Sequence, residues 1–273
     1  MVASLSAIGI RRVRLTGGEP TLRRDIVEVA AAVASIPGVE EVALTTNGQQ
    51  LDRLAARLRA AGVSRLNVSL DSLDATRLRR ISGPAASLSR ILAGLKTAAA
   101  VGFASLKLNV VVLRGENDSE LGDLARQAWR LSAIPRFIEL MPFGPGARVR
   151  IEDIRRLLEV QGVALVPENW RDWGPATYMR GASEGIEGRL EGRIGFIGPM
   201  SECFCATCNR IRIAADGSLR TCLARPDRVD LGGLAASGDV LGIQRAVREA
   251  LTRKPERHQL GNGSPASMRA LGG

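Results

Sequence analysis

Cysteine is absent from the chain before Cys203, and all of its 4 cysteines lie between Cys203 and Cys222. A disulfide framework would spread cysteines along the chain, so this distribution excludes a small disulfide-stapled fold. Residues 1–10 also lack the basic start and the long apolar core of a secretory signal peptide. We therefore expect a reducing, cytoplasmic environment.

Long hydrophobic runs and aromatic residues are also scarce. Apolar stretches end well before the ~20 residues that a membrane-spanning helix needs, so we expect no membrane span. Aromatic residues make up 3% of the chain, and the 38 basic residues include few lysines, namely Lys96, Lys107 and Lys254. The arginines that carry the net charge of +10 are spread along the chain rather than gathered in one basic arm. These features argue against a nucleic-acid partner and favour an anionic small molecule.

Short β-branched runs alternate with amphipathic stretches up to about Pro142, which is typical of βα units around a parallel sheet. The predicted strands are 12–15, 42–45, 66–70, 106–112 and 137–141, and the predicted helices are 24–35, 51–61, 88–101 and 118–131. The fold class is therefore α/β, with residues 1–142 as one domain. Residues 143–273 form a second region that contains a loop-rich stretch up to about Pro199, the helix 151–160 and a tail rich in Gly, Ser and Ala.

Polar or glycine-rich residues follow each predicted strand, at the edge where parallel α/β folds bind ligands. Any one of these segments is more commonly a turn or a helix cap than a binding site. The segments are Thr16–Pro20, Thr45–Gly48, Ser69–Asp71, Asn109 on its strand, and Glu139–Pro142.

The cysteine spacing is typical of a metal site. Cys205 and Cys208 form a close pair, and Cys222 follows on the other side of the expected hairpin turn Asp216–Gly217. Three thiolates would leave one iron of a [4Fe–4S] cluster open to a substrate atom. Four thiolates, with Cys203 added, would suit tetrahedral zinc instead. On a strand Cys203 and Cys205 would point the same way, so both ligand sets stay open.

Arg210 and Arg212 come directly after the cysteine pair and would share one face of a strand. Two guanidinium groups beside a metal are suited to phosphate recognition. A solvated strand face is the equally simple alternative.

Taken together and in order, the motifs resemble the GTP 3′,8-cyclase family, the radical S-adenosylmethionine (SAM) enzymes of molybdenum cofactor biosynthesis. The resemblance covers nearly the whole chain. It rests on Arg14–Pro20 (RLTGGEP), Thr45–Gly48 (TTNG), Asn67–Asp71 (NVSLD), Lys107–Asn109 (KLN), Arg136–Pro142 (RFIELMP), Phe204–Arg212 (FCATCNRIR) and the terminal Gly272–Gly273.

The resemblance implies an incomplete parallel TIM-like (βα)6-type barrel with a C-terminal extension that holds an iron–sulfur cluster and GTP. It implies conversion of GTP to (8S)-3′,8-cyclo-7,8-dihydroguanosine 5′-triphosphate, a precursor of the pterin cofactor. The implied partners are a possible second copy of the chain and a downstream pterin-forming enzyme. By position, the residues implied to contact SAM are Gly18, Ser69 and Met141. Those implied to contact GTP are Arg14, Thr45, Lys107, Arg210 and Arg212, and those implied to ligate the [4Fe–4S] cluster are Cys205, Cys208 and Cys222. The resemblance also implies that Gly272–Gly273 insert into the active site.

The sequence departs from the family pattern at its start. The family carries an N-terminal Cys-x-x-x-Cys-x-x-Cys motif for the cluster that cleaves SAM, and this sequence has none. We expect either an N-terminally truncated chain or a degenerate relative that binds ligand without radical chemistry, and the intact substrate-side motifs favour truncation. A four-cysteine zinc protein and a radical SAM peptide maturase are the alternative functions.

Overall fold

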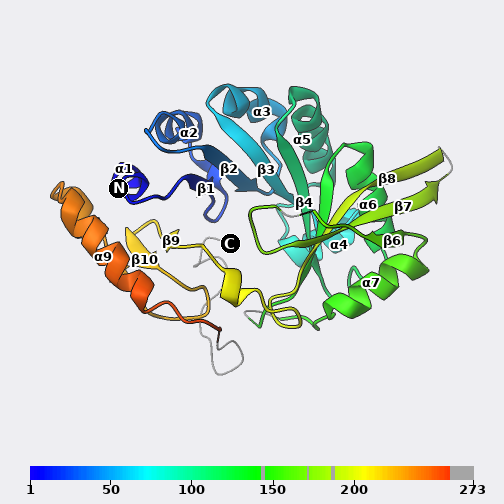
Figure 1. Ribbon diagram of the computed structural model, residues 1–273. Coiled ribbons are helices and arrows are strands. Elements are labelled where there is room, and N and C mark those ends of the chain that lie inside the picture. Colours follow the sequence, from blue (N-terminus) through cyan, green and yellow to red (C-terminus); the bar gives the residue numbers. More distant parts are fainter. Residues whose placement is uncertain (143–144, 171, 186–187, 259–273) are drawn as a thin grey trace.

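The computed structural model describes residues 1–142, 145–170, 172–185 and 188–258, and it shows an α/β fold built on one large sheet (Figure 1). The 8-stranded sheet has the order β1-β2-β3-β4-β5-β8-β7-β6. Its parallel strands are β1 (Arg12–Leu15), β2 (Glu41–Thr46), β3 (Val63–Ser69), β4 (Ser105–Val112), β5 (Ile134–Glu139) and β8 (Gly188–Ile197), and β7 (Thr177–Gly185) and β6 (Ala164–Pro167) extend it in antiparallel fashion. Within the described residues β1 and β6 end the sheet, so the barrel is partial.

The helices near the first strands cover one side of the sheet, as Figure 1 shows for α2, α3 and α5 above β1–β4. Their apolar side chains and those of alternate strand residues form one continuous core. The helices are α2 (Ile26–Ala34), α3 (Leu51–Ala60), α4 (Ala75–Ser82), α5 (Leu88–Val101), α6 (Leu121–Arg130) and α7 (Ile151–Val160). The five predicted strands and the predicted helices are confirmed, with ends that differ by a few residues. No helix among the described residues is long and apolar enough to cross a membrane.

The expectation of a loop-rich stretch between residues 143 and 199 was wrong where β6, β7 and β8 lie, whereas Trp170 and Trp173 do lie in a loop. Glycines replace the β-branched residues that usually signal a strand, and Trp129 shows why. A Cβ atom on Gly181 or on Gly192 would lie 2.7 Å from a ring carbon of Trp129. The indole also donates a hydrogen bond to the carbonyl oxygen of Arg193, at 3.0 Å. Only a residue without a side chain lets this hairpin pack so closely on α6.

A second, smaller core joins the two ends of the chain. Helix α1 (Val2–Ser6) packs on α9 (Val240–Thr252), and Leu5, Leu219, Leu231 and Val247 are buried together there. Figure 1 shows α1 beside α9 and β10. The remaining elements of this part are β9 (Arg212–Ile213), β10 (Ser218–Arg220), β11 (Val229–Asp230) and α8 (Gly232–Ala236), with the hairpin turn at Asp216–Gly217 as predicted.

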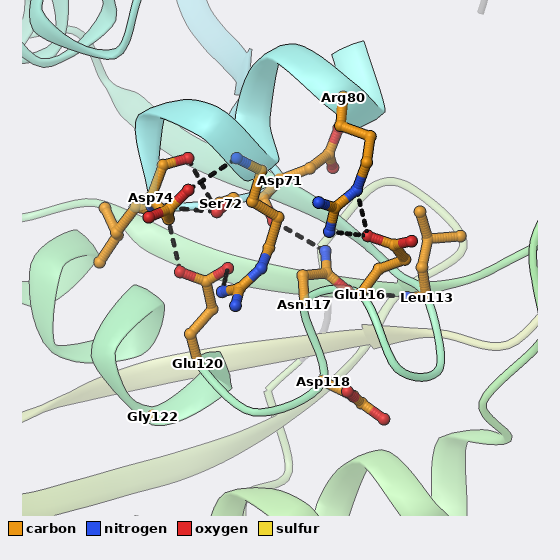
Figure 2. A network of polar contacts seen from close by, with 12 residues as sticks. Asp71, Ser72, Asp74, Arg80, Leu113, Glu116, Asn117, Asp118, Glu120 and Gly122 are labelled. Carbon is orange, nitrogen blue, oxygen red and sulfur yellow. Dashed lines mark hydrogen bonds and ion pairs between the residues drawn. The ribbon is translucent and has the colours of Figure 1, made fainter.

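The loops after β3 and β4 are joined by a buried polar network (Figure 2). Asn117 is fully buried and donates to the carbonyl oxygens of Asp71 (2.7 Å) and Val111 (2.8 Å). Its own oxygen accepts the backbone N–H of Leu113, at 2.8 Å. Glu120 accepts the backbone N–H of Leu73 and a guanidinium N–H of Arg77. These bonds hold together two loops at the carboxyl edge of the sheet.

We expect Asn117→Ala to lower the free energy of unfolding by about 2–3 kcal/mol, because it leaves buried backbone groups without partners. Urea unfolding followed by circular dichroism measures this change. Ser119→Ala, at an exposed position of the same loop, is the matched control and should leave the midpoint unchanged. Equal midpoints for the two variants would contradict the structural role of Asn117.

Candidate functional site

One face of the sheet is polar, because charged and amide side chains alternate with leucine and valine along buried strands. Asn67 lies beside Lys107 in register, and Asn109 lies beside Arg136. Leu108, which lies between Lys107 and Asn109 on β4, belongs to the apolar core under the helices. Successive strand residues point to opposite sides, so the polar residues share the face away from the helices.

A cluster of cations occupies this polar face. The buried guanidinium of Arg136 donates to the side-chain oxygens of Asn67 (2.7 Å) and Asn109 (2.6 and 2.9 Å). Lys107 and Arg65 both contact the carboxylate of Asp172. Burying several positive charges side by side is costly unless negative charge or hydrogen bonds compensate. Asp172 supplies that compensation from the loop between β6 and β7.

The pKa values on this face show how strongly the charges interact. Burial and the neighbouring charge of Arg136 lower the pKa of Lys107 to about 8. Burial alone would raise the pKa of Asp172, but hydrogen bonds from Arg65 and Lys107 lower it to about 2. The side chain of Arg14 reaches solvent, yet the surrounding protein and the charge of Arg136 lower its pKa to about 10. The face is therefore crowded with positive charge at neutral pH.

Aromatic side chains hold the β6–β7 loop against the sheet. The ring of Trp170 meets that of Tyr178 edge-on with centroids 4.5 Å apart. The guanidinium of Arg193 lies over Trp170, and that of Arg12 lies 3.7 Å from the ring centroid of Trp173. This loop was not among the predicted site segments. Its two tryptophans place Asp172 among the cations.

The residues implied for SAM lie at the carboxyl edge of the sheet. Gly18 follows β1, Ser69 ends β3, and Met141 follows β5. No heavy atom beyond its chain neighbours lies within 4 Å of a Cβ built on Gly18, so a ligand can approach its backbone. The adjacent Glu19 fixes this loop, because its carboxylate accepts the Thr46 hydroxyl at 2.7 Å and the backbone N–H of Asn47 at 2.6 Å.

The segment that carries the cysteines is anchored at both of its ends. The fully buried Glu139 accepts the backbone N–H groups of Met200 (3.0 Å) and Ser201 (2.8 Å). Arg155 of α7 forms two hydrogen bonds with the Glu202 carboxylate, at 2.6 and 3.1 Å. Beyond the cysteine pair, the Lys254 ammonium donates to the carbonyl oxygens of Cys208 and Arg210.

This segment does not adopt the strand geometry in which Cys203 and Cys205, or Arg210 and Arg212, would share one face. Cys203 and Cys205 do not lie on a strand, because Cys205 begins the short 3-10 helix Cys205–Thr207. Arg210 and Arg212 do not share a strand either, since β9 begins at Arg212. The anchors on either side bend the chain into a tight turn where a strand would run straight.

The cations implied for GTP nevertheless converge. Arg14 on β1 is close enough to Arg210 for their charges to interact, which brings the cysteine segment to the polar face of the sheet. Arg212 interacts in the same way with Arg210 and with the thiols of Cys208 and Cys222. Thr45 and Lys107 flank Asn67, whose amide lies 3.3 Å from the Thr45 hydroxyl. Gly272–Gly273 lie outside the described residues.

The sulfur donors are suited to a thiophilic metal. Cys205, Cys208 and Cys222 are half-buried and form no disulfide. Burial and the neighbouring Cys203 raise the pKa of Cys205, and the charge of the Cys222 thiolate adds to this effect. Arg210 lowers the pKa of Cys208 despite its burial. Arg210 donates to the Cys208 sulfur at 3.6 Å. Half-buried thiols beside guanidinium groups fit a cluster that carries negative charge.

Comparison with known proteins supports the family resemblance over most of the chain. Residues 1–128 match the Radical SAM superfamily model, and residues 134–260 match the Molybdenum Cofactor Synthesis C model. The GTP 3′,8-cyclase of Pseudomonas entomophila (strain L48) is 42% identical over 271 residues, which are 96% of this chain and 79% of that relative. The GTP 3′,8-cyclase of Moorella thermoacetica is 40% identical over 97% of this chain and 82% of its own length.

Among solved structures, a radical SAM methyltransferase from Sphaerobacter thermophilus aligns with a TM-score of 0.47 and 20% identity, over 59% of this chain and 54% of that one. The sheet, its polar face and the family matches together define a radical SAM enzyme. Within that class, the chain belongs to the GTP 3′,8-cyclase family of molybdenum cofactor biosynthesis.

The position of Asp172 yields a testable prediction. Asp172→Asn removes the carboxylate that stabilises charged Lys107, so the pKa of Lys107 should fall further below about 8. We expect the free energy of unfolding near neutral pH to fall by about 3 kcal/mol. The pKa of Asp172 is lowered from its ordinary value of 3.8 to about 2. The wild-type chain therefore keeps the stabilisation by the Asp172 carboxylate above pH 3.8 and loses it as the pH falls toward 2.

Carbon-13 methylation followed by NMR titration measures the pKa of Lys107 directly, because the chain has so few lysines. Glu152→Gln, which breaks an exposed pair with Arg156 on α7, is the matched control and should change neither quantity. An unchanged or higher pKa of Lys107 in Asp172→Asn would show that the contact does not set its charge.

Proposed function

We propose that this chain binds GTP at the polar face of the sheet and acts in the GTP 3′,8-cyclase reaction. The observation that carries the proposal is the approach of Arg210 to Arg14 on the sheet, with Arg212 close to Arg210 and to the sulfurs of Cys208 and Cys222. Guanidinium groups bind phosphate oxygens in pairs, so this cluster suits the triphosphate. A metal held by the thiols at its edge would lie next to the bound nucleotide.

We assign the residues as follows. Arg14, Lys107, Arg210 and Arg212 bind the anionic part of GTP, and Thr45 offers a hydroxyl on the same face. Gly18, Ser69 and Met141 contact SAM at the carboxyl edge of the sheet. Residues 1–142 thus contribute to both ligand sites, and residues 143–273 add Arg210, Arg212 and the cluster cysteines. The bound cluster supplies an open iron that can hold a substrate atom, with Cys205, Cys208 and Cys222 as its ligands.

The protein residues orient and shield the substrate. Asp172 and the asparagines hold the cations in fixed positions before the ligand arrives, so little ordering is needed on binding. The buried guanidinium of Arg136 is itself held by Asn67 and Asn109. The roles that we assign to the residues of this chain are therefore the binding and orientation of the substrate. A reducing cytoplasm, a second copy of the chain and a downstream pterin-forming enzyme belong to the same proposal.

The thiolate assignment can be tested by anaerobic reconstitution with iron and sulfide. Cys205→Ser, Cys208→Ser and Cys222→Ser should each lose most of the [4Fe–4S] absorbance, and Cys203→Ser should retain it, because a three-thiolate cluster does not need Cys203. Iron and sulfide analysis with EPR of the reduced protein measures the loading. Loss of the cluster in Cys203→Ser would overturn the three-thiolate assignment.

GTP affinity should depend on the charge of Lys107. As pH rises through about 8, the ammonium of Lys107 loses its proton, so GTP should bind more weakly, by up to about tenfold per pH unit. Calorimetric titration between about pH 7 and pH 9.5 measures this. Lys107→Met should bind GTP more weakly at neutral pH with a flatter profile, and it keeps every cysteine as a control. Equal pH profiles for the two proteins would exclude Lys107 from the site, and absence of GTP binding by the reconstituted wild type would overturn the proposed function.

A further inference from the structure

The structure brings a second set of metal-binding atoms together beside the expected cluster ligands. The ligand atoms of Cys203, Cys205 and His258 all lie within 4.8 Å of one another. No other such group of His, Cys, Asp and Glu is found within the described part of the chain. The sequence separation between Cys203 and His258, the only histidine, hides this group from any motif search.

We propose that Cys203, Cys205 and His258 form a mononuclear site for a thiophilic divalent cation of the zinc class. Two thiolates and one imidazole are a ligand set that zinc accepts, with a fourth position left for water or another donor. Tetrahedral zinc with Zn–S bonds of about 2.3 Å needs sulfur atoms about 3.8 Å apart. The observed group is thus within about 1 Å of a coordinating geometry.

One ring nitrogen of His258 is held by a hydrogen bond to the backbone. Its Nε2 lies 2.6 Å from the carbonyl oxygen of Pro199. A carbonyl oxygen carries no proton, so Nε2 must donate, and the neutral ring then has its lone pair on Nδ1. Metal-binding histidines commonly make this kind of hydrogen bond, which fixes both the tautomer and the ring orientation.

The backbone around the three ligands is held from several sides. Pro199 leads directly into the turn that Glu139 holds through Met200 and Ser201. The Lys254 ammonium ties the end of α9, shortly before His258, to the carbonyl oxygen of Cys208. These contacts bring the ligands close before any metal arrives, which lowers the ordering cost of binding.

The site shares Cys205 with the proposed cluster ligands, so the two metals compete. A thiolate committed to zinc at this site is unavailable to the cluster, because Cys208 and Cys222 alone provide too few ligands. The inference goes beyond the proposed function, since it concerns the chain before its cluster is assembled. It also predicts that zinc bound first will block cluster assembly.

The direct test uses Co²⁺ as the probe on the metal-free chain under anaerobic conditions. In the Cys208→Ser/Cys222→Ser double variant the cluster ligands are removed, yet tetrahedral cobalt bands with thiolate charge transfer should remain. Adding Cys203→Ser or His258→Gln to that background should weaken Co²⁺ binding by about 100-fold. Cobalt binding that disappears in the double variant, or that survives both added changes, would overturn the proposal.

A second measurement uses the chain with all other cysteines in place. Zn²⁺ added before iron and sulfide should reduce the cluster yield of the wild type. In Cys203→Ser and in His258→Gln the zinc concentration that halves the yield should rise by at least about tenfold. Circular dichroism confirms folding, and glutamine at position 258 can still donate to Pro199. Unchanged zinc sensitivity would place the inhibitory zinc on the cluster cysteines and refute the shared site, whereas failure of the cluster in zinc-free wild type would refute the proposed function alone.

Discussion

The contact of Asp172 with Lys107 and Arg65 is the interaction on which the polar face of the sheet depends. A buried ammonium beside a buried guanidinium would be expelled, neutralised or solvated if no negative charge lay against it. The carboxylate comes from a loop rather than from a strand, and the loop is held by Trp170 and Trp173. The packing of the Trp170 and Trp173 rings thus holds Asp172 against the cations, which lets the cations on the polar face stay charged.

The same dependence on distant anchors governs the cysteine segment. Glu139 lies at the end of β5, where the hydrogen bonds of the sheet fix its backbone. Its carboxylate accepts the backbone N–H groups of Met200 and Ser201 and so fixes the position of that turn. The turn sets where Cys205 begins its short helix, and Lys254 fixes the far side. Because these anchors lie on the barrel and on α9, the placement of Arg210 near Arg14 is a property of the whole fold.

The regular part of the fold was predictable because its signals are local. Strands β1–β5 and helices α3, α5 and α7 carry the apolar periodicity that burial on one side requires. Strands β7 and β8 were not predicted, because they carry glycines where strands usually carry β-branched residues. Gly181 and Gly192 are needed there because the Trp129 ring of α6 packs against them. Among the charged residues of the site, Lys107 was assigned from the motif Lys107–Asn109 that carries the family resemblance, but the role of Asp172 depends on where a loop crosses the sheet. The pairing of Cys203 with His258 likewise depends on the path of α9 and leaves no trace in the local sequence.

The charge balance of the site finally argues for the kind of ligand it binds. Within the described residues the cations are Arg14, Arg65, Lys107, Arg136, Arg210 and Arg212, whereas the carboxylates that pair with them are Glu41 and Asp172. The neighbouring positive charges contribute, together with burial, to the lowered pKa values of Arg14 and Lys107. An anion that carries several charges would restore those pKa values, and the free energy of that restoration would appear as binding affinity. A triphosphate supplies such charge in one compact group, whereas an uncharged peptide would leave the excess in place. The charge balance of the site therefore favours a nucleotide over an uncharged peptide on grounds independent of any sequence similarity.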